Sequence, residues 1–211
     1  MRAAIVASLL VLLVAACGGG DAASEAVVCD EVEAPAPREP ETLEPPDGTL
    51  DPTKDWSLVF ETSCGDFTVD LDLTLAPETS ASLVLLAREG FYDDTIFHRV
   101  VPDFVIQGGD PTQSGNGSPG YATLDRPPPS VRYTKGVVAM AKTNIAPAGT
   151  AGSQFFVVTA EDAELDAAYA VVGRVADGLD VVEKIGELGD PETQRPTEPV
   201  VIRSVTVDES S

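Results

Sequence analysis

Alternation of apolar and polar residues is the dominant pattern of the chain from about residue 56 onwards. From Phe67 to Leu73 every second residue is apolar, which is the period of a strand with one buried face. Between residues 76 and 90 the apolar positions instead recur at helical spacing, with Pro77 suited to the first turn and Gly90 to the end. The expected elements are two strands within 57–73 around a turn at 63–66, a helix over 76–90, two strands within 97–112 on either side of a break at 102–103, strands at 136–142, 153–160, 169–175 and 200–207, and a helix over 178–188.

Strands therefore dominate, and they do not alternate regularly with helices as in a parallel α/β protein. A long loop rich in Gly and Pro runs from 108 to about 130. The pattern favours an antiparallel barrel or sandwich with helices at its ends.

The first residues have the layout of an export signal. Met1-Arg2 is a short basic start, and the apolar run at 3–14 is shorter than the roughly 20 residues that span a bilayer. The following "LVAAC", ending at Cys17, resembles the bacterial lipobox, which implies cleavage after residue 16 and a lipid on Cys17. The alternative is an ordinary secretory signal with an incidental cysteine.

Residues 17–55 form an acidic, Pro-rich segment with few large apolar side chains, so we expect an extended linker that holds the following domain, 56–211, away from the membrane. The formal net charge of the whole chain is -22, which keeps an exported protein soluble and argues against nucleic acid as a partner. Two further cysteines, Cys29 and Cys64, either pair as a disulfide that staples the linker to the domain or remain free thiols.

The stretch "FHRVVPDFVIQGGDPT", residues 97–112, holds the only histidine and an arginine among apolar residues. Strand alternation places Phe97 and Arg99 on one face, and Val105 and Gln107 on one face after the break. From this pattern alone, the stretch is either barrel core with a surface arginine or the wall of an apolar pocket that contains a cation.

Four stretches in order, "FHRVVPDFVIQGGDPT", "GVVAMAK", "GSQFFVVT" and "LDAAYAVVGRV", look like the cyclophilin family. The resemblance covers about Trp56 to the C-terminus. It implies a mainly β fold, a closed eight-stranded antiparallel barrel capped by two α-helices, and peptidyl-prolyl cis-trans isomerase activity that needs neither a metal nor a cofactor.

The resemblance also implies roles for single residues. The catalytic positions fall on Arg99, Phe104 and Gln107. The substrate-binding positions fall on Val105, Ala141, Phe156, Leu165 and Tyr169. The chain departs from the eukaryotic pattern at Glu164, where a tryptophan tied to cyclosporin binding is usual, at Tyr169, usually histidine, and at Lys142, usually asparagine.

These observations predict a monomeric, lipid-anchored, extracytoplasmic isomerase that acts on proline-containing polypeptides and helps exported proteins to fold. Two alternatives remain open. One is a non-catalytic module of the same fold that binds proline-containing segments, and the other is a purely structural envelope protein. The isomerase would turn over a proline peptide, whereas the binding module would bind the peptide without turnover. The structural protein would neither bind the peptide nor turn it over.

Overall fold

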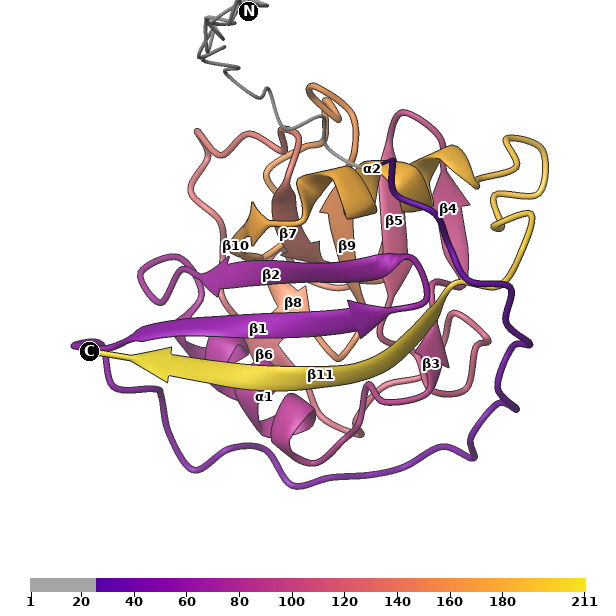
Figure 1. The fold of residues 1–211 in the computed structure, drawn as a ribbon. Coiled ribbons are helices and arrows are strands. Elements are labelled where there is room, and N and C mark those ends of the chain that lie inside the picture. The colour runs from indigo at the N-terminus through magenta and orange to yellow at the C-terminus, as the bar shows by residue number, and fades with distance from the viewer. Residues whose placement is uncertain (1–25) are drawn as a thin grey trace, which may run out of the picture.

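One strongly curled antiparallel sheet of nine strands organises the molecule, whose computed structural model describes residues 26–211 (Figure 1). The strands follow the order β3-β11-β1-β2-β10-β7-β9-β5-β4, and β6 pairs with β8 in a separate small sheet. The strand bounds are β1 Asp55–Thr62, β2 Gly65–Leu71, β3 Thr95–Ile96, β4 Arg99–Val101, β5 Val105–Gly108, β6 Thr123–Leu124, β7 Val137–Met140, β8 Thr150–Ala151, β9 Phe155–Val158, β10 Val171–Asp177 and β11 Val201–Ser210.

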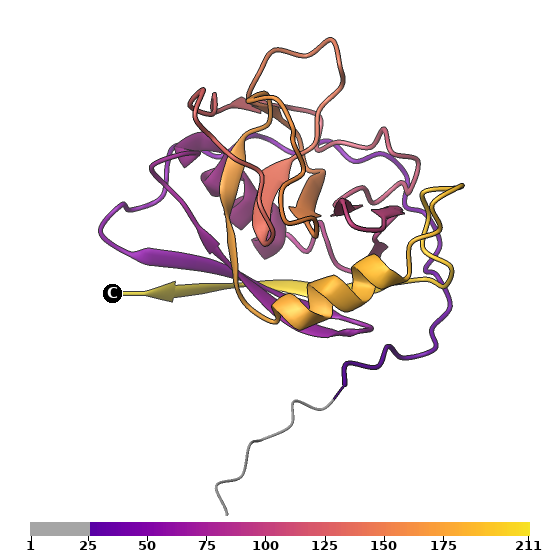
Figure 2. The same ribbon diagram turned by 90° about the horizontal axis from the view of Figure 1, so that it is seen from above.

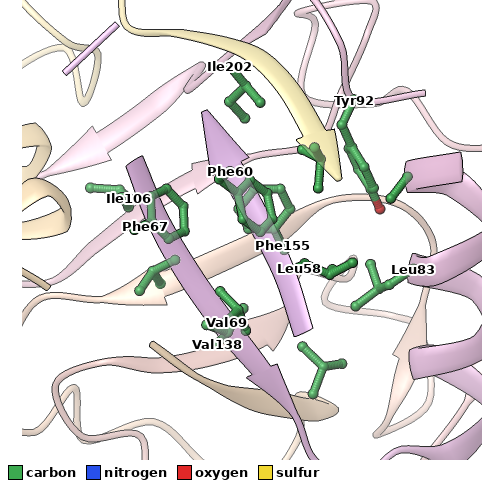
Figure 3. Packing of buried hydrophobic residues seen from close by; sticks show 14 of the residues in the cluster. Leu58, Phe60, Phe67, Val69, Leu83, Tyr92, Ile106, Val138, Phe155 and Ile202 are labelled. Atoms are coloured by element: carbon green, nitrogen blue, oxygen red, sulfur yellow. The ribbon is translucent and has the colours of Figure 1, made fainter. Parts of the chain in front are cut away.

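The alternation read from the sequence produces the β1–β2 hairpin and the main core. Phe60 on β1 lies directly opposite Phe67 on β2, and their rings stack with centroids 4.7 Å apart. Phe155 of β9 joins them from across the curled sheet, with its ring 5.1 Å from that of Phe60 (Figure 3). All three side chains are buried, so the concave side of the sheet is filled by aromatic and aliphatic groups.

Two helices lie at opposite ends of the curled sheet, as both ribbon views show (Figures 1 and 2). Helix α1 spans Pro77–Arg88 and buries Leu83, Val84 and Leu86. Helix α2 spans Leu179–Glu187 and buries Val181, Val182 and Ile185. Both helices agree with the sequence prediction to within one or two residues at each end.

The expectation of a closed barrel of eight strands is wrong in its details. The strand expected to begin at Phe97 begins only at Arg99, as β4, which pairs with β5. Phe97 and His98 lie outside any strand, and a separate short strand, β3, precedes them and pairs with β11. These two short strands occupy the two edges of the sheet order. The sheet is therefore a strongly curled half-barrel with nine strands rather than a closed ring of eight.

Residues 26–54, which we call the strap, do not project from the domain as a spacer. They have no helix or strand, as expected, but run along the domain surface in an extended path (Figure 1). Val27, Leu43 and Leu50 pack against the core, and the Trp56 indole donates to the carbonyl of Asp51, 3.1 Å away. Composition did not reveal this docking because it depends on backbone hydrogen bonds and on a few scattered apolar side chains.

A disulfide joins Cys29 of the strap to Cys64 in the β1–β2 turn. Beside it, the backbone N–H of Asp30 donates to the carbonyl of Ser63 over 2.7 Å, and the Asp30 carboxylate pairs with Arg203. Cys17 and the expected signal at 1–16 lie outside the described residues. Within residues 26–211, no helix is long and apolar enough to cross a membrane.

Candidate active site

The register of four neighbouring strands brings three of the predicted site residues into one row. Arg99 on β4 lies opposite Gln107 on β5, and Gln107 in turn lies opposite Phe156 on β9. Phe156 then pairs with Ala139 on β7. Because directly opposed residues of adjacent strands project to the same side of a sheet, the row forms a continuous surface.

This surface is the outer side of the sheet, and here one sequence expectation fails. Phe97 was expected to share a face with Arg99, but Phe97 is fully buried in the main core, where its ring contacts those of Phe67 and Phe155. The chain is out of strand geometry between β3 and β4, so the alternation restarts after His98. Val105 and Gln107 do share the outer side, as predicted.

A hollow of about 290 Å³ opens on this side, and we call it the proline hollow after the ring that the family resemblance predicts it to bind. Its wall contains every residue that the resemblance assigns to catalysis or substrate binding, together with Lys142 and Asn144. The assigned residues are Arg99, Phe104, Val105, Gln107, Ala141, Phe156, Leu165 and Tyr169. Glu164 is exposed and is not among the lining residues.

Aromatic rings give the proline hollow a fixed shape. The ring of Tyr169 meets that of Phe156 edge-on, with centroids 5.5 Å apart, and Tyr133 packs behind both. The Tyr133 hydroxyl donates to the carbonyl of Tyr169 over 2.8 Å and accepts from its N–H over 3.0 Å. These two bonds fix the backbone that carries Tyr169, so a loop residue serves as a rigid wall.

Arg99 is held at the rim of the proline hollow by two amide side chains. Its Nε donates to Oε1 of Gln194 over 3.0 Å, and its NH1 donates weakly to Oε1 of Gln107 over 3.5 Å. The guanidinium carbon lies 5.9 Å from the centre of the Phe104 ring. Burial lowers the pKa of Arg99 from its ordinary value, but an arginine stays protonated in proteins. Among residues 26–211 no carboxylate pairs with it, so its charge is not neutralised.

A chain of hydrogen bonds extends from Arg99 along the outer side. Gln107 Nε2 donates to Oε1 of Gln154 over 3.0 Å, and Gln154 Nε2 donates to the carbonyl of Gly117 over 3.0 Å. Gly117 belongs to the segment 110–120, which we call the groove loop. It also lines a second hollow of about 500 Å³ beside the first, and the two hollows share Gln107, Ala141, Lys142 and Asn144.

The buried carboxylate of Asp110 organises the groove loop. Its oxygens accept from the backbone N–H groups of Thr112, Gly115 and Gly117 at 2.6–3.1 Å. Burial raises the pKa of Asp110, but these bonds and one from the Thr112 hydroxyl outweigh it and leave the pKa below its ordinary value. The loop is therefore built around a permanent negative charge.

His98 lies behind Gln107, with its Nε2 3.5 Å from the Gln107 amide nitrogen and its Nδ1 buried without a partner in the described residues. Burial lowers the pKa of His98; nearby Asp110 raises it and the Arg99 charge lowers it further, and the net shift is downward. The imidazole is therefore neutral at neutral pH.

Sequence reasoning missed Gln154, Gln194 and Tyr133 as parts of the site. Gln154 immediately precedes "FFVV" and could have been noticed there because strand alternation places it on the same side as Phe156. Gln194 carried no signal, since it lies in a polar loop 95 residues away from Arg99. Tyr133 lies between the expected loop and the expected strand at 136–142, outside the stretches that carry the family resemblance.

Comparison with known proteins points to a single family. The family described as "Cyclophilin type peptidyl-prolyl cis-trans isomerase/CLD" matches residues 57–207. "Peptidyl-prolyl cis-trans isomerase-like 1" of Gibberella zeae is 37% identical over 158 residues, covering 72% of this chain and 96% of that protein. "Probable peptidyl-prolyl cis-trans isomerase A" of Mycobacterium bovis is 36% identical over 176 residues, covering 75% and 96%.

Among solved structures, a cyclophilin type peptidyl-prolyl cis-trans isomerase of Cryptosporidium parvum, crystallised in the presence of the dipeptide Ala-Pro, superposes with a TM-score of 0.66. The two sequences are 28% identical, and the match covers 72% of this chain and 98% of that one. The matched family range begins after the strap, which ends at residue 54.

Proposed function

The chain belongs to the cyclophilin family of peptidyl-prolyl cis-trans isomerases, and from that premise we propose how its site accelerates rotation about X-Pro bonds and where it acts. The reaction breaks no covalent bond. An X-Pro bond rotates slowly because the nitrogen lone pair is delocalised into the carbonyl, which gives a barrier of about 18–20 kcal/mol. The uncatalysed exchange takes tens to hundreds of seconds.

Arg99 is the group that favours the twisted state. In that state the nitrogen has become pyramidal and regained its lone pair, so a guanidinium donor aimed at it binds the twisted form more strongly than the planar one. The partly buried setting of Arg99 strengthens this interaction relative to bulk water. A rate gain of about 10⁵ would need about 7 kcal/mol of such differential stabilisation.

The proline hollow holds one side of the bond while the other side turns. Phe156, Tyr169 and Leu165 give an apolar recess for the proline ring, and Gln107 is placed to bind substrate backbone. Since Gln107 also accepts from Arg99 NH1, the same side chain would orient the guanidinium and the substrate together.

One observation carries the assignment: a charged guanidinium, tethered through Nε by Gln194, lines a hollow that the rings of Phe156 and Tyr169 also line, without an ion-pair partner in residues 26–211. The structural arginines of residues 26–211 bind either a carboxylate, as Arg132 and Arg203 do, or a backbone carbonyl, as Arg38 does, whereas the described bonds of the Arg99 guanidinium go only to two side-chain amides. Here two of its nitrogens are used for orientation, and the remaining N–H groups are left for a ligand.

We further propose that the enzyme acts on exported polypeptides outside the cytoplasm, anchored to the membrane as a monomer through a lipid on Cys17. The support is the signal-like start of the sequence and the Cys29–Cys64 disulfide, which suits an oxidising compartment. Mass spectrometry of the membrane fraction would test the anchor, because a Cys17→Ser variant should lose the lipid mass and appear in the soluble fraction.

The test of the catalytic role compares Arg99→Ala with Arg99→Lys in a protease-coupled assay on a proline peptide. We expect Arg99→Ala to lose about 10² to 10³ of the turnover, or about 3–4 kcal/mol, as when a preorganised donor is removed elsewhere. Arg99→Lys keeps the charge but loses the rigid fork of donors, so an intermediate loss is expected.

Thermal unfolding of the same variants is the control and should remain near the wild-type value, because Arg99 has no ion pair to lose. Wild-type turnover in Arg99→Ala would overturn the role. Tight binding of the peptide by the wild type without turnover would instead identify a non-catalytic proline-binding module.

A further inference from the structure

The strap is part of a covalent ring laid over the domain. It is attached at one end by the disulfide between Cys29 and Cys64, 35 positions apart, and at the other it continues directly into β1. Figures 1 and 2 show the indigo and violet trace following the domain between these ends. Without the disulfide, only non-covalent contacts would hold its N-terminal half.

The middle of the strap is bound to the groove loop at three points. The N–H of Arg38 donates to the carbonyl of Pro111 over 2.9 Å, and the N–H of Leu43 donates to that of Pro119 over 2.9 Å. From the opposite direction, Gln113 Nε2 donates to the carbonyl of Pro35 over 2.8 Å. The contacts thus cover the loop from its beginning to its end.

The two segments also approach closely at Gly120. This residue has φ +88°, and a Cβ placed on it would lie 2.5 Å from Cγ2 of Thr42. Arg38 fixes the strap further from the other side, since its guanidinium donates to the carbonyl of Phe91 and lies 5.8 Å from the centre of that ring. The strap is therefore held between the turn that follows α1 and the groove loop.

The opposite side of the groove loop faces the candidate active site. Gly115, Asn116 and Gly117 line the 500 Å³ hollow, and the Gly117 carbonyl holds Gln154, which in turn holds Gln107 beside Arg99. Apart from Asp110, the loop is rich in Gly, Ser and Pro and buries little apolar surface, which is typical of segments that open easily. An external brace would keep this wall in one position.

We propose that the strap is a positioning element for the substrate site, taken as the proline hollow and the adjoining 500 Å³ hollow that the groove loop lines, and that the disulfide keeps the strap docked. Each hydrogen bond to the groove loop is weak by itself in water. Closing the ring raises the effective concentration of the strap at its binding surface, so all three bonds form together. Loss of the disulfide would release the groove loop and weaken substrate binding, while Arg99 would remain able to favour the twisted state. This inference rests on the proposed function.

The first experiment uses no substrate and measures amide hydrogen exchange in the oxidised wild type and in Cys29→Ser, which alters the strap and leaves the buried Cys64 in place. We expect the amides of Thr112, Gly115 and Gly117 to exchange at least tenfold faster in Cys29→Ser. The amide of Glu164, which donates to the Asp162 carboxylate in the same kind of turn, should not change. Val28→Ser is the matched variant, because Val28 is a neighbouring strap residue that is 79% exposed, and it should behave as wild type.

The second experiment measures KM and kcat for a proline peptide. Cys29→Ser, or reduction of the wild type, should raise KM three- to tenfold with kcat within twofold, and reduction of Cys29→Ser should add nothing. Gln113→Asn should raise KM about twofold, because it loses the reach to Pro35 but suits the φ of +56° at this position.

A Cys29→Ser variant that unfolds at lower temperature, yet keeps wild-type KM and wild-type exchange in the groove loop, would overturn the proposal and leave the disulfide a purely stabilising role. Failure of the proposed function has a different signature. The oxidised wild type would then show no turnover, while the exchange experiment would still decide whether the strap orders the loop.

Discussion

The inner and outer sides of strand β9 differ in what their side chains do, and Phe155 and Phe156 show the difference within one peptide unit. Phe155 points inward and contacts Phe60, Tyr92 and Phe97 in the main core. Phe156 points outward, where it contacts Tyr133 and Tyr169 and lines the proline hollow. Neighbouring residues of the same type thus belong to separate clusters.

Successive side chains of a strand point to opposite faces, so Phe155 and Phe156 serve different roles. On the inner side, burial from every direction makes Phe155 a determinant of stability. On the outer side, part of the surface around Phe156 is left as a hollow that a ligand could fill. The curled sheet can therefore change its outer residues with little disturbance of its core, and it can hold Arg99 and Gln107 on a rigid backbone.

Alanine substitutions at Phe155 and Phe156 should reveal the difference between the inner and outer sides of β9 most clearly. Phe155→Ala should lower the free energy of unfolding by about 4 kcal/mol, as expected when a fully enclosed aromatic ring is removed. Phe156→Ala should cost about 2 kcal/mol, because one side of its ring already faces the hollow, but it should raise KM about tenfold or more through loss of the wall. Urea unfolding and peptide turnover measure the two quantities.

The decisive result is that Phe155→Ala has the larger effect on the free energy of unfolding and Phe156→Ala has the larger effect on KM. At a urea concentration where it is still folded, Phe155→Ala should keep wild-type KM. If the two variants lose equal stability and have equal KM values, the inner side of β9 does not serve stability separately from a binding role of the outer side.

Much of the fold was predictable because it follows from local alternation. The hairpin of β1 and β2 and both helices were expected from apolar positions at periods of two and 3.6. The break between β3 and β4, at Phe97 and His98, was not expected, because neither residue resembles a turn signal. The docking of the strap was missed for a different reason: its bonds use backbone N–H groups of Arg38 and Leu43, which every sequence possesses.

The residues of the site were predictable to the extent that they lie in recognisable strand motifs. Arg99, Gln107 and Phe156 are such residues, and the register brings them together. Gln194 could not be found in this way, since its partnership with Arg99 joins a strand to a polar loop that is distant in sequence. Loop residues that orient a catalytic group follow from tertiary structure alone.

Gln194 offers a smaller and sharper test of the outer side. Its φ of +56° is one that asparagine and glycine tolerate, so Gln194→Asn and Gln194→Gly remove the reach to Arg99 without straining the backbone. We expect kcat to fall about tenfold in both, or about 1.4 kcal/mol, with KM within twofold, because a mobile guanidinium loses its aim at the rotating bond.

Two further measurements separate this effect from general loosening of the loop. The Nε–H resonance of Arg99 should exchange faster with water in both variants, and their unfolding midpoints should stay near that of the wild type. Unchanged kcat in both variants would mean that Gln107 alone is sufficient to orient Arg99.

The smallest expected effect concerns His98, which lies behind the outer row. Burial lowers its pKa in the folded state, so folding favours the neutral imidazole. The stability that follows is fully present above the unfolded pKa of about 6.5 and is lost as the pH falls below it towards the folded pKa, by at most about 1.4 kcal/mol per pH unit. Because His98 is the only histidine, and carboxylates titrate lower, urea unfolding between pH 6.5 and 5 reports mainly on this group. Over this range the free energy of unfolding of the wild type should fall, and that of His98→Gln should change less.

Turnover should be flat from pH 6.5 to 9, since Arg99 stays charged. Below that range KM should rise, because a proton on Nε2 would face the Gln107 amide nitrogen 3.5 Å away and disturb the bond from Gln107 to Gln154, through which the groove loop acts on substrate binding. The same pH dependence of stability in His98→Gln as in the wild type would show that His98 is not the titrating group.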